Sequence, residues 1–172
     1  MHAEAALRRK RDYAVAGRLA VIVMPREGER TTGLAKAQYS CPVRLFVVRH
    51  AEAAPGEPDD LRTLTPYGQQ QARELGRRFV RKGIKPDAVL TSPLLRARQT
   101  AEGIATAVGL EPEPDERLAP GASADDVRAV VAGRGDTVVV VGHPPDCGLI
   151  AAAIEGGDAP AFPAGGIREL QL

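Results

Sequence analysis

Two of the three histidines in this chain stand directly after short apolar runs. His50 follows Leu45–Val48 and Arg49, and His143 follows the run Thr137–Gly142. A neutral imidazole is a nucleophile, and its reference pKa of about 6.5 keeps most of it neutral near pH 7. An arginine guanidinium offers a planar fork of N–H donors that fits phosphate oxygens. The pair Arg49-His50 therefore places a cation and a nucleophile together at the end of a predicted strand.

A third segment, Thr91–Thr100, adds a second arginine fork. It contains Arg96. Its second and third residues, Ser92-Pro93, form a dipeptide that favours the start of a helix. The first turn of that helix would present backbone N–H groups and the positive end of its dipole to an anion. Ser92 would either hydrogen-bond phosphate or cap the helix, and the sequence leaves both roles open. Arg98 lies two residues beyond Arg96 and is expected to point to solvent.

The elements that must position these residues alternate along the chain. Short apolar or β-branched runs predict strands at 43–48, 87–91, 137–141 and 167–172, the last at an edge of the sheet. Apolar spacing and capping residues predict helices at 65–82, 93–108, 124–131 and 146–154, with Thr65 and Ser123 as N-caps. This alternation predicts an α/β fold, a three-layer sandwich with a mainly parallel central sheet and helices on both faces. Ligands of such sheets bind at the carboxyl ends of the strands, where His50, Ser92 and His143 are expected.

The connecting segments carry less information. Ala51–Leu64 is rich in Glu and Asp, a composition typical of a solvated loop, although a loop at this edge would also help to set specificity. Pro112, Pro114 and Pro120 are predicted to interrupt the stretch after Gly109. Neither segment contains a signature that identifies a substrate.

Composition excludes several classes of protein. The net charge is +1 and 26% of the residues are charged, which gives no basic footprint for nucleic acid. Aromatic residues make up 3% and tryptophan is absent, so stacking surfaces for bases are not expected. Cys41 and Cys147 lack the spacing of a zinc site or a disulfide framework, which predicts a cytoplasmic protein. Cys147 is expected to be a small core residue.

Residues 1–40 differ from the rest of the chain. They combine a basic cluster, an apolar run at 19–24 and a polar, glycine-containing stretch. Arg18 interrupts the apolar region and no A-x-A site follows, so a signal peptide is not predicted. The run is also shorter than the ~18 apolar residues that span a membrane. We expect residues 1–40 to form a poorly ordered N-terminal extension, with Met24 as an alternative start, and residues 43–172 to form one domain.

Four sequence blocks, taken in order, resemble the histidine phosphatase superfamily, which has the phosphoglycerate-mutase-like fold. The blocks are Val48–Glu52, Leu64–Ala72, Ser92–Ala101 and Val141–His143. An Arg-His pair alone would be weak evidence, whereas four blocks in this order are specific. The short domain and the segment Leu118–Pro120 resemble the small SixA-type branch of phosphohistidine phosphatases more than the longer mutases.

The resemblance implies a two-step phosphoryl transfer that needs neither a metal nor another cofactor. His50 would take the phosphoryl group, and water would then hydrolyse the phosphohistidine. Arg49, Arg96 and His143 would bind the phosphoryl oxygens, where charge accumulates, and Ser92 is a further possible ligand. The partner would be a phosphorylated substrate, in particular a phosphohistidine-bearing signalling protein. We expect a monomer that acts without nucleic acid or a membrane.

The proton donor is the least defined part of this site. Many relatives carry a glutamate between the second arginine block and the second histidine, and Glu116 is the candidate here by order. Glu52 and Asp115 are rivals, and all three carboxylates would otherwise be solvated loop residues. An alkoxide leaving group needs a proton because its conjugate acid is about as weak as water, at ~15.7, whereas imidazole, near ~6.5, departs readily. A weak proton donor therefore favours a phosphoramidate over a phosphate ester.

Other functions stay open from the sequence. A small-molecule phosphomonoesterase or a mutase would use the same residues, but a mutase needs a lid, and the chain between Thr100 and Thr137 leaves little room for one. A phosphate-binding module without turnover would keep both arginines and could lose a histidine, and this sequence retains both histidines. An enzyme of the phosphatase class is the favoured interpretation.

Overall fold

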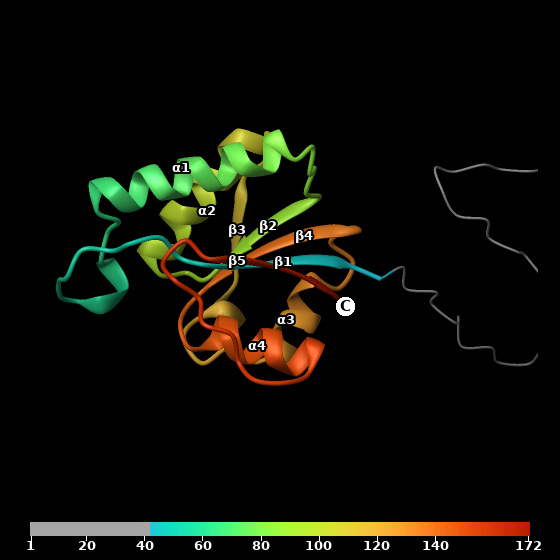
Figure 1. The fold of residues 1–172 in the computed structure, drawn as a ribbon. Helices are drawn as coiled ribbons and strands as arrows, with labels where there is room; N and C mark the ends of the chain where they lie inside the picture. The colour runs from blue at the N-terminus through green and yellow to red at the C-terminus, as the bar shows by residue number, and fades with distance from the viewer. Residues whose placement is uncertain (1–41) are drawn as a thin grey trace, which may run out of the picture. The chain divides into compact units, whose positions relative to one another are not determined.

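The structure, a computed structural model, describes residues 42–172, so the extension predicted over residues 1–40 lies outside the described residues. In the described part, one sheet lies between two layers of helices (Figure 1). Its strands are β1 (Arg44–Arg49), β2 (Ala88–Thr91), β3 (Pro112–Pro114), β4 (Thr137–Gly142) and β5 (Ile167–Gln171). The helices are α1 (Pro66–Arg81), α2 (Leu95–Val108), α3 (Ala124–Val131) and α4 (Asp146–Glu155), and two 3₁₀ turns are η1 (Asp59–Leu61) and η2 (Glu116–Leu118).

The helices are divided between the two faces of the sheet. α1 and α2 cover one face, and α3 and α4 cover the other (Figure 1). The strand order is β3-β2-β4-β1-β5, in which the first four strands run parallel and β5 is antiparallel to β1. This arrangement confirms the predicted three-layer α/β fold. No helix within residues 42–172 is long and apolar enough to cross a membrane.

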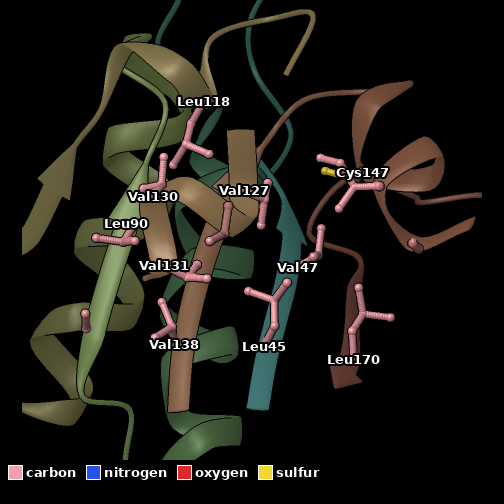
Figure 2. Packing of buried hydrophobic residues seen from close by; sticks show 14 residues of the cluster. Leu45, Val47, Leu90, Leu118, Val127, Val130, Val131, Val138, Cys147 and Leu170 are labelled. Carbon is pink, nitrogen blue, oxygen red and sulfur yellow. The ribbon is translucent and has the colours of Figure 1, made fainter. Parts of the chain in front are cut away.

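Both faces of the sheet are buried, which explains the uninterrupted apolar runs of β1 and β4. Because side chains alternate along a strand, each of these strands contributes to two separate cores. Val47 and Val138 pack with α3 residues such as Val127, with Cys147 and with Leu170 (Figure 2). The other core joins the sheet to α1 and α2 and contains Phe46, Val48, Leu75, Phe79, Val139 and Ile104. The prediction that Cys147 is a core residue is confirmed, since the side chain is buried.

The predicted helix caps are confirmed at two helices. The side-chain oxygen of Thr65 accepts a hydrogen bond from the backbone N–H of Gly68, and Ser123 forms a capping box with Asp126. The third helix start differs from the prediction, because α2 begins at Leu95 and its N-cap residue is Leu94. Ser92 is therefore not the N-cap, and its hydroxyl is available for another role.

A short edge strand, β3, lies where the prolines predicted only an interruption. It pairs in parallel with β2, with Val89 opposite Pro112 and Thr91 opposite Pro114. Proline cannot donate a backbone hydrogen bond, but at the edge of a sheet one side of the strand needs no partner, so proline is tolerated there. The prediction for this segment was wrong for that reason. β3 matters to the site because η2 and Glu116 follow it directly.

The register of the sheet brings the ends of three strands together. Arg49 lies opposite Gly142 in the β1–β4 pair, and the backbone N–H of His50 donates to the carbonyl of Gly142 at 3.0 Å. The backbone N–H of Ser92 donates to the carbonyl of Val141 at 3.0 Å. The residues that follow β1, β4 and β2 are thus held side by side at one edge of the sheet, as the sequence predicted.

Candidate active site

The two predicted histidines face each other at the carboxyl ends of β1 and β4. Their ring centroids are 5.3 Å apart, with the rings tilted by 56°. His50 is 8% exposed and His143 is 2% exposed, so both rings lie beneath the surface. This separation is short enough for both rings to contact one small group placed between them and the neighbouring arginines.

The ring of His50 is fixed by one backbone hydrogen bond. Its Nδ1 lies 2.7 Å from the carbonyl oxygen of Ala51. A carbonyl oxygen only accepts, so Nδ1 must carry the hydrogen, and the lone pair of the neutral ring is then on Nε2. Burial lowers the pKa of His50, the contact with Ala51 partly opposes this, and the charges of Arg96, Arg49 and Arg62 lower the pKa further. The ring is therefore neutral and nucleophilic at neutral pH.

His143 is held by Ser92. The Nε2 atom lies 2.7 Å from the Ser92 hydroxyl, which also accepts a hydrogen bond from the backbone N–H of Leu94 at 3.3 Å. We infer that the hydroxyl donates to Nε2, because its hydrogen has no other acceptor among the described residues, and Nδ1 then carries the hydrogen of the neutral ring. Burial, with the nearby His50 and Arg96, lowers the pKa of His143 to about 3. His143 is thus a neutral hydrogen-bond donor in the free protein.

The two predicted arginines are held by carbonyl oxygens and a carboxylate. Arg49 Nη1 donates to the carbonyl of Phe162 at 2.6 Å. Arg96, whose side chain is 7% exposed, donates from Nη1 to the carbonyl of Asp59 at 2.7 Å and from Nη2 to the Asp59 carboxylate at 3.0 Å. Both guanidinium groups are therefore fixed before any ligand binds.

Among the side chains of residues 42–172, buried nitrogen and oxygen atoms without a hydrogen-bond partner occur only at this site. They are Arg49 Nε, Arg96 Nε and His143 Nδ1. A buried polar group without a partner costs about 1–3 kcal/mol, so native proteins rarely keep one without a reason. All three belong to residues predicted to bind phosphate, and all three are hydrogen-bond donors. These donors are available to an oxyanion bound at this site.

The segment that joins α4 to β5 closes one side of the site. The backbone N–H of Gly165 donates to the carbonyl of His50 at 3.1 Å, and the backbone N–H of Arg49 donates to the carbonyl of Gly166 at 2.9 Å. Gly165 has a φ of +69°, a conformation that favours glycine. Together with the contact from Phe162 to Arg49, these bonds fix the backbone on which the nucleophile stands.

Two further charged residues belong to the site, and sequence reasoning missed both. Asp59 bonds Arg96, and its other carboxylate oxygen accepts from Arg62 Nη1 at 2.9 Å. Arg62 Nε donates to the carbonyl of Ala54 at 2.8 Å. The composition of Ala51–Leu64 is typical of a solvated loop, yet Asp59 and Arg62 extend from it to the site. The single cue in the sequence was the position of Arg62, two residues before the block Leu64–Ala72.

The three carboxylates considered as proton donors have different surroundings. Arg117 contacts both oxygens of Asp115 and lowers the pKa of this carboxyl to about 2, so Asp115 is unsuited to give a proton near neutral pH. Glu52 accepts from the Thr65 hydroxyl at 2.9 Å at the start of α1. Glu116 is exposed in η2 and has no side-chain hydrogen bond to another residue of the described part. None of the three contacts His50 or His143 there.

The remaining expectations concern Arg98 and metal binding. Arg98 is exposed on α2, which confirms that it points away from the site. Within residues 42–172, no group of three or more His, Cys, Asp and Glu side chains is arranged to hold a metal ion.

The chain is similar in sequence to known phosphatases. Residues 45–120 match the family model of the histidine phosphatase superfamily (branch 1). An uncharacterised protein of Picosynechococcus sp. is 38% identical over 120 residues, which cover 65% of this chain and 73% of that protein. The mitochondrial serine/threonine-protein phosphatase Pgam5 of Drosophila simulans is 36% identical over 88 residues, which cover 51% of this chain but only 30% of Pgam5.

The fold is similar to that of a solved phosphatase as well. The structure of the protein histidine phosphatase SixA complexed with tungstate aligns with a TM-score of 0.68 and 27% sequence identity. This alignment covers 74% of the chain described here and 86% of the SixA chain. The family match over residues 45–120 contains Arg49, His50, Ser92 and Arg96. The chain therefore belongs to the histidine phosphatase superfamily and is a hydrolase of the phosphatase class.

Proposed function

We propose that this phosphatase removes the phosphoryl group from phosphohistidine on a protein, with His50 as the nucleophile. The observation that carries this proposal is the set of unsatisfied donors, Arg49 Nε, Arg96 Nε and His143 Nδ1, beside a ring whose free lone pair is on Nε2. A nucleophile and three free hydrogen-bond donors in the same site are what phosphoryl transfer requires.

The first step exchanges one phosphorus–nitrogen bond for another. The Nε2 lone pair of His50 attacks phosphorus, and the bond from phosphorus to the substrate imidazole breaks. Its electron pair goes to the substrate nitrogen, and the ring leaves neutral when its other nitrogen carries a proton. Throughout this step His50 Nδ1 keeps its hydrogen and donates it to the Ala51 carbonyl, which holds the phosphorylated ring in place. Because substrate and intermediate are both phosphoramidates, this step is close to balanced in energy.

The second step returns the site to its starting state. A water oxygen attacks phosphorus, the bond to Nε2 breaks with its electron pair returning to the nitrogen, and the water gives one proton to the phosphate or to solvent. Arg49, Arg96 and His143 would donate to the equatorial oxygens in both steps, where negative charge is largest. Ser92 would act through His143 as a positioning residue, since its hydroxyl bonds Nε2 of that ring.

The charge of the site fits a phosphoryl dianion. Arg49, Arg62 and Arg96 carry three positive charges, Asp59 carries one negative charge, and both histidines are neutral. The sum of +3 and −1 is +2, which balances a group that carries two negative charges. A carboxylate with one negative charge would leave a net charge of +1 at the site, so the charge also favours phosphate over carboxylate ligands.

The choice of phosphohistidine depends on the leaving group. Within residues 42–172, neither Glu52, Asp115 nor Glu116 contacts the histidines. The pKa of Asp115 is lowered to about 2, so this carboxyl group holds no proton near neutral pH. Imidazole leaves without help from an acid, whereas an alkoxide does not. The solved relative SixA is a protein histidine phosphatase, which agrees with this choice. A phosphomonoesterase is the second candidate, because the relative Pgam5 is a serine/threonine-protein phosphatase.

A turnover panel tests the proposal. The full chain is compared on a phosphohistidine-bearing protein domain, a phosphoserine peptide and p-nitrophenyl phosphate, and kcat/KM is expected to be highest for the phosphohistidine protein. His50→Ala should lower kcat at least about 1,000-fold, because the nucleophile is lost. Arg98→Ala is the matched control on the exposed side of α2 and should retain full activity. Faster cleavage of the phosphoserine peptide would favour the phosphomonoesterase instead.

Trapping the intermediate separates an enzyme from a phosphate-binding module. Rapid denaturation after mixing with labelled substrate should leave phosphate on His50 that is stable in base and lost in acid. Wild-type protein that folds normally, binds phosphate and yet never carries this label would contradict a role for His50 as nucleophile.

A further inference from the structure

Asp59 accepts hydrogen bonds from both terminal nitrogens of Arg96. Its main-chain carbonyl accepts from Nη1 at 2.7 Å, and its carboxylate oxygen Oδ2 accepts from Nη2 at 3.0 Å. The other oxygen, Oδ1, accepts from Arg62 at 2.9 Å. One exposed residue therefore bonds two of the three arginines whose charges act on His50.

The same guanidinium is predicted to bind the phosphoryl group. Arg96 has five N–H donors, and two of them are engaged by Asp59, while the buried Nε has no partner. Arginine grips an oxyanion most strongly when two neighbouring N–H groups bond two oxygens. A bidentate grip on phosphate from the Nε side would use Nε–H and one N–H of Nη2, while another N–H of Nη2 bonds the Asp59 carboxylate. Phosphate and Asp59 would therefore share one guanidinium, with two negative groups held next to each other.

We propose that Asp59 competes with phosphate for Arg96 and so limits the affinity of the site for inorganic phosphate, the product. The carboxylate would hold the guanidinium in place between turnovers and share it when a phosphoryl group is present. This inference takes the ligand, phosphate, from the proposed function. It goes beyond that function by assigning a role in product release to a residue outside the phosphate-binding set.

The location of Asp59 suits such a role. Its side chain is 57% exposed, and the η1 turn that carries it contains no buried residue. A shift of this turn would therefore leave both hydrophobic cores intact. Hydrogen bonds from Arg62 and Arg96 lower the pKa of Asp59, so the carboxylate is charged at neutral pH. Its charge also reaches the opposite side of the site, where it opposes the lowering of the His143 pKa.

A purely structural role for Asp59 makes the opposite prediction. If the contact only orients Arg96, its removal leaves the guanidinium loose and weakens phosphate binding. If Asp59 competes with phosphate, its removal deletes a like charge next to the anion and leaves the charge of Arg96 to the anion alone. The sign of the change in phosphate affinity therefore distinguishes the two roles.

The experiment measures binding of inorganic phosphate to the full chain by isothermal titration calorimetry. Asp59→Asn keeps the shape of the side chain and removes its charge, and we expect Kd for phosphate to fall about tenfold because a like charge beside the anion is lost. Asp60→Asn is the matched control. Asp60 stands in the same turn, has no side-chain hydrogen bond within residues 42–172 and carries the same charge, so Kd should stay within twofold. Unchanged or weaker phosphate binding by Asp59→Asn would overturn the proposal.

Two additions keep the result decisive. Asp59→Ser removes the carboxylate by a different route and must also tighten phosphate binding, whether or not Asp59→Asn folds well. Binding is measured without substrate, so a protein that binds phosphate tightly after Asp59→Asn but hydrolyses nothing would support this inference and refute the proposed function. If neither the wild type nor the variants bind phosphate, both proposals fail.

Discussion

Acidification should destabilise this protein through His143. Burial and the neighbouring charges lower the pKa of this residue from 6.5 to about 3 in the folded protein, while the unfolded chain keeps the ordinary value. Below pH 6.5 the unfolded state therefore binds a proton that the folded state rejects, and the free energy of unfolding falls as the pH falls. The stability is fully present above pH 6.5 and is lost progressively down to about pH 3.

The size of the loss follows from the two pKa values. Between pH 7 and pH 5, linkage of one such group lowers the free energy of unfolding by about 2 kcal/mol. The pKa of His50 is also lowered, so His50 adds to the loss in the same direction. His143→Gln removes the titrating group and keeps a polar atom where Nε2 contacts Ser92, so the variant should lose about 2 kcal/mol less than the wild type.

Urea unfolding at pH 7 and pH 5 measures this difference. The buffers must be free of phosphate, because an anion bound between the histidines favours the protonated ring and would mask the effect. The quantity to compare is the change in unfolding free energy between the two pH values, for the wild type and for His143→Gln. Equal changes in both proteins, within about 0.5 kcal/mol, would refute the reasoning, because His143 would then not titrate between the folded and unfolded states.

Two other substitutions test the proton donor and the packing of the helices. Glu116→Gln should leave kcat/KM for a phosphohistidine protein within twofold of the wild type, because imidazole leaves without help from an acid. A large loss on phosphohistidine would show that the leaving group needs a proton from Glu116. Gly103→Ala should lower the free energy of unfolding by about 1–3 kcal/mol, because the added Cβ would lie 2.7 Å from the carbonyl carbon of Ala72 on α1. Gly83→Ala is the comparison, because a Cβ there would meet no atom within 4 Å, while its φ of +63° strains the backbone locally. Urea unfolding of both variants separates the effect of overpacking from that of backbone strain.

The strands and helices were predictable where sequence patterns are local. The runs in β1 and β4 and the caps at Thr65 and Ser123 depend on neighbouring residues, and each was predicted correctly. The strand β3 was missed because two prolines argue against a strand unless it lies at an edge of the sheet. Edge position is a property of the whole sheet, and no window of sequence contains it.

The site shows the same division. His50, His143 and Ser92 were predictable because each follows a strand, and parallel strands place their ends together. Asp59 and Arg62 stand in a connection whose path depends on long-range contacts, above all the bond from Asp59 to Arg96, 37 residues away. The carbonyl of Phe162 contacts Arg49 across 113 residues of sequence, and a backbone group leaves no trace in residue type. Such partners are visible only in three dimensions.

The position of β1 in the sheet has a consequence for how the protein is made. This strand carries Arg49 and leads to the nucleophile, yet both of its neighbours, β4 and β5, are the last two strands within residues 42–172. During synthesis β1 emerges early and keeps both hydrogen-bonding edges open until those strands follow, which exposes it to pairing with other chains. The site forms only when β4 and β5 have paired with β1. Phosphatase activity therefore reports complete folding, and a chain that stops before β5 should have none.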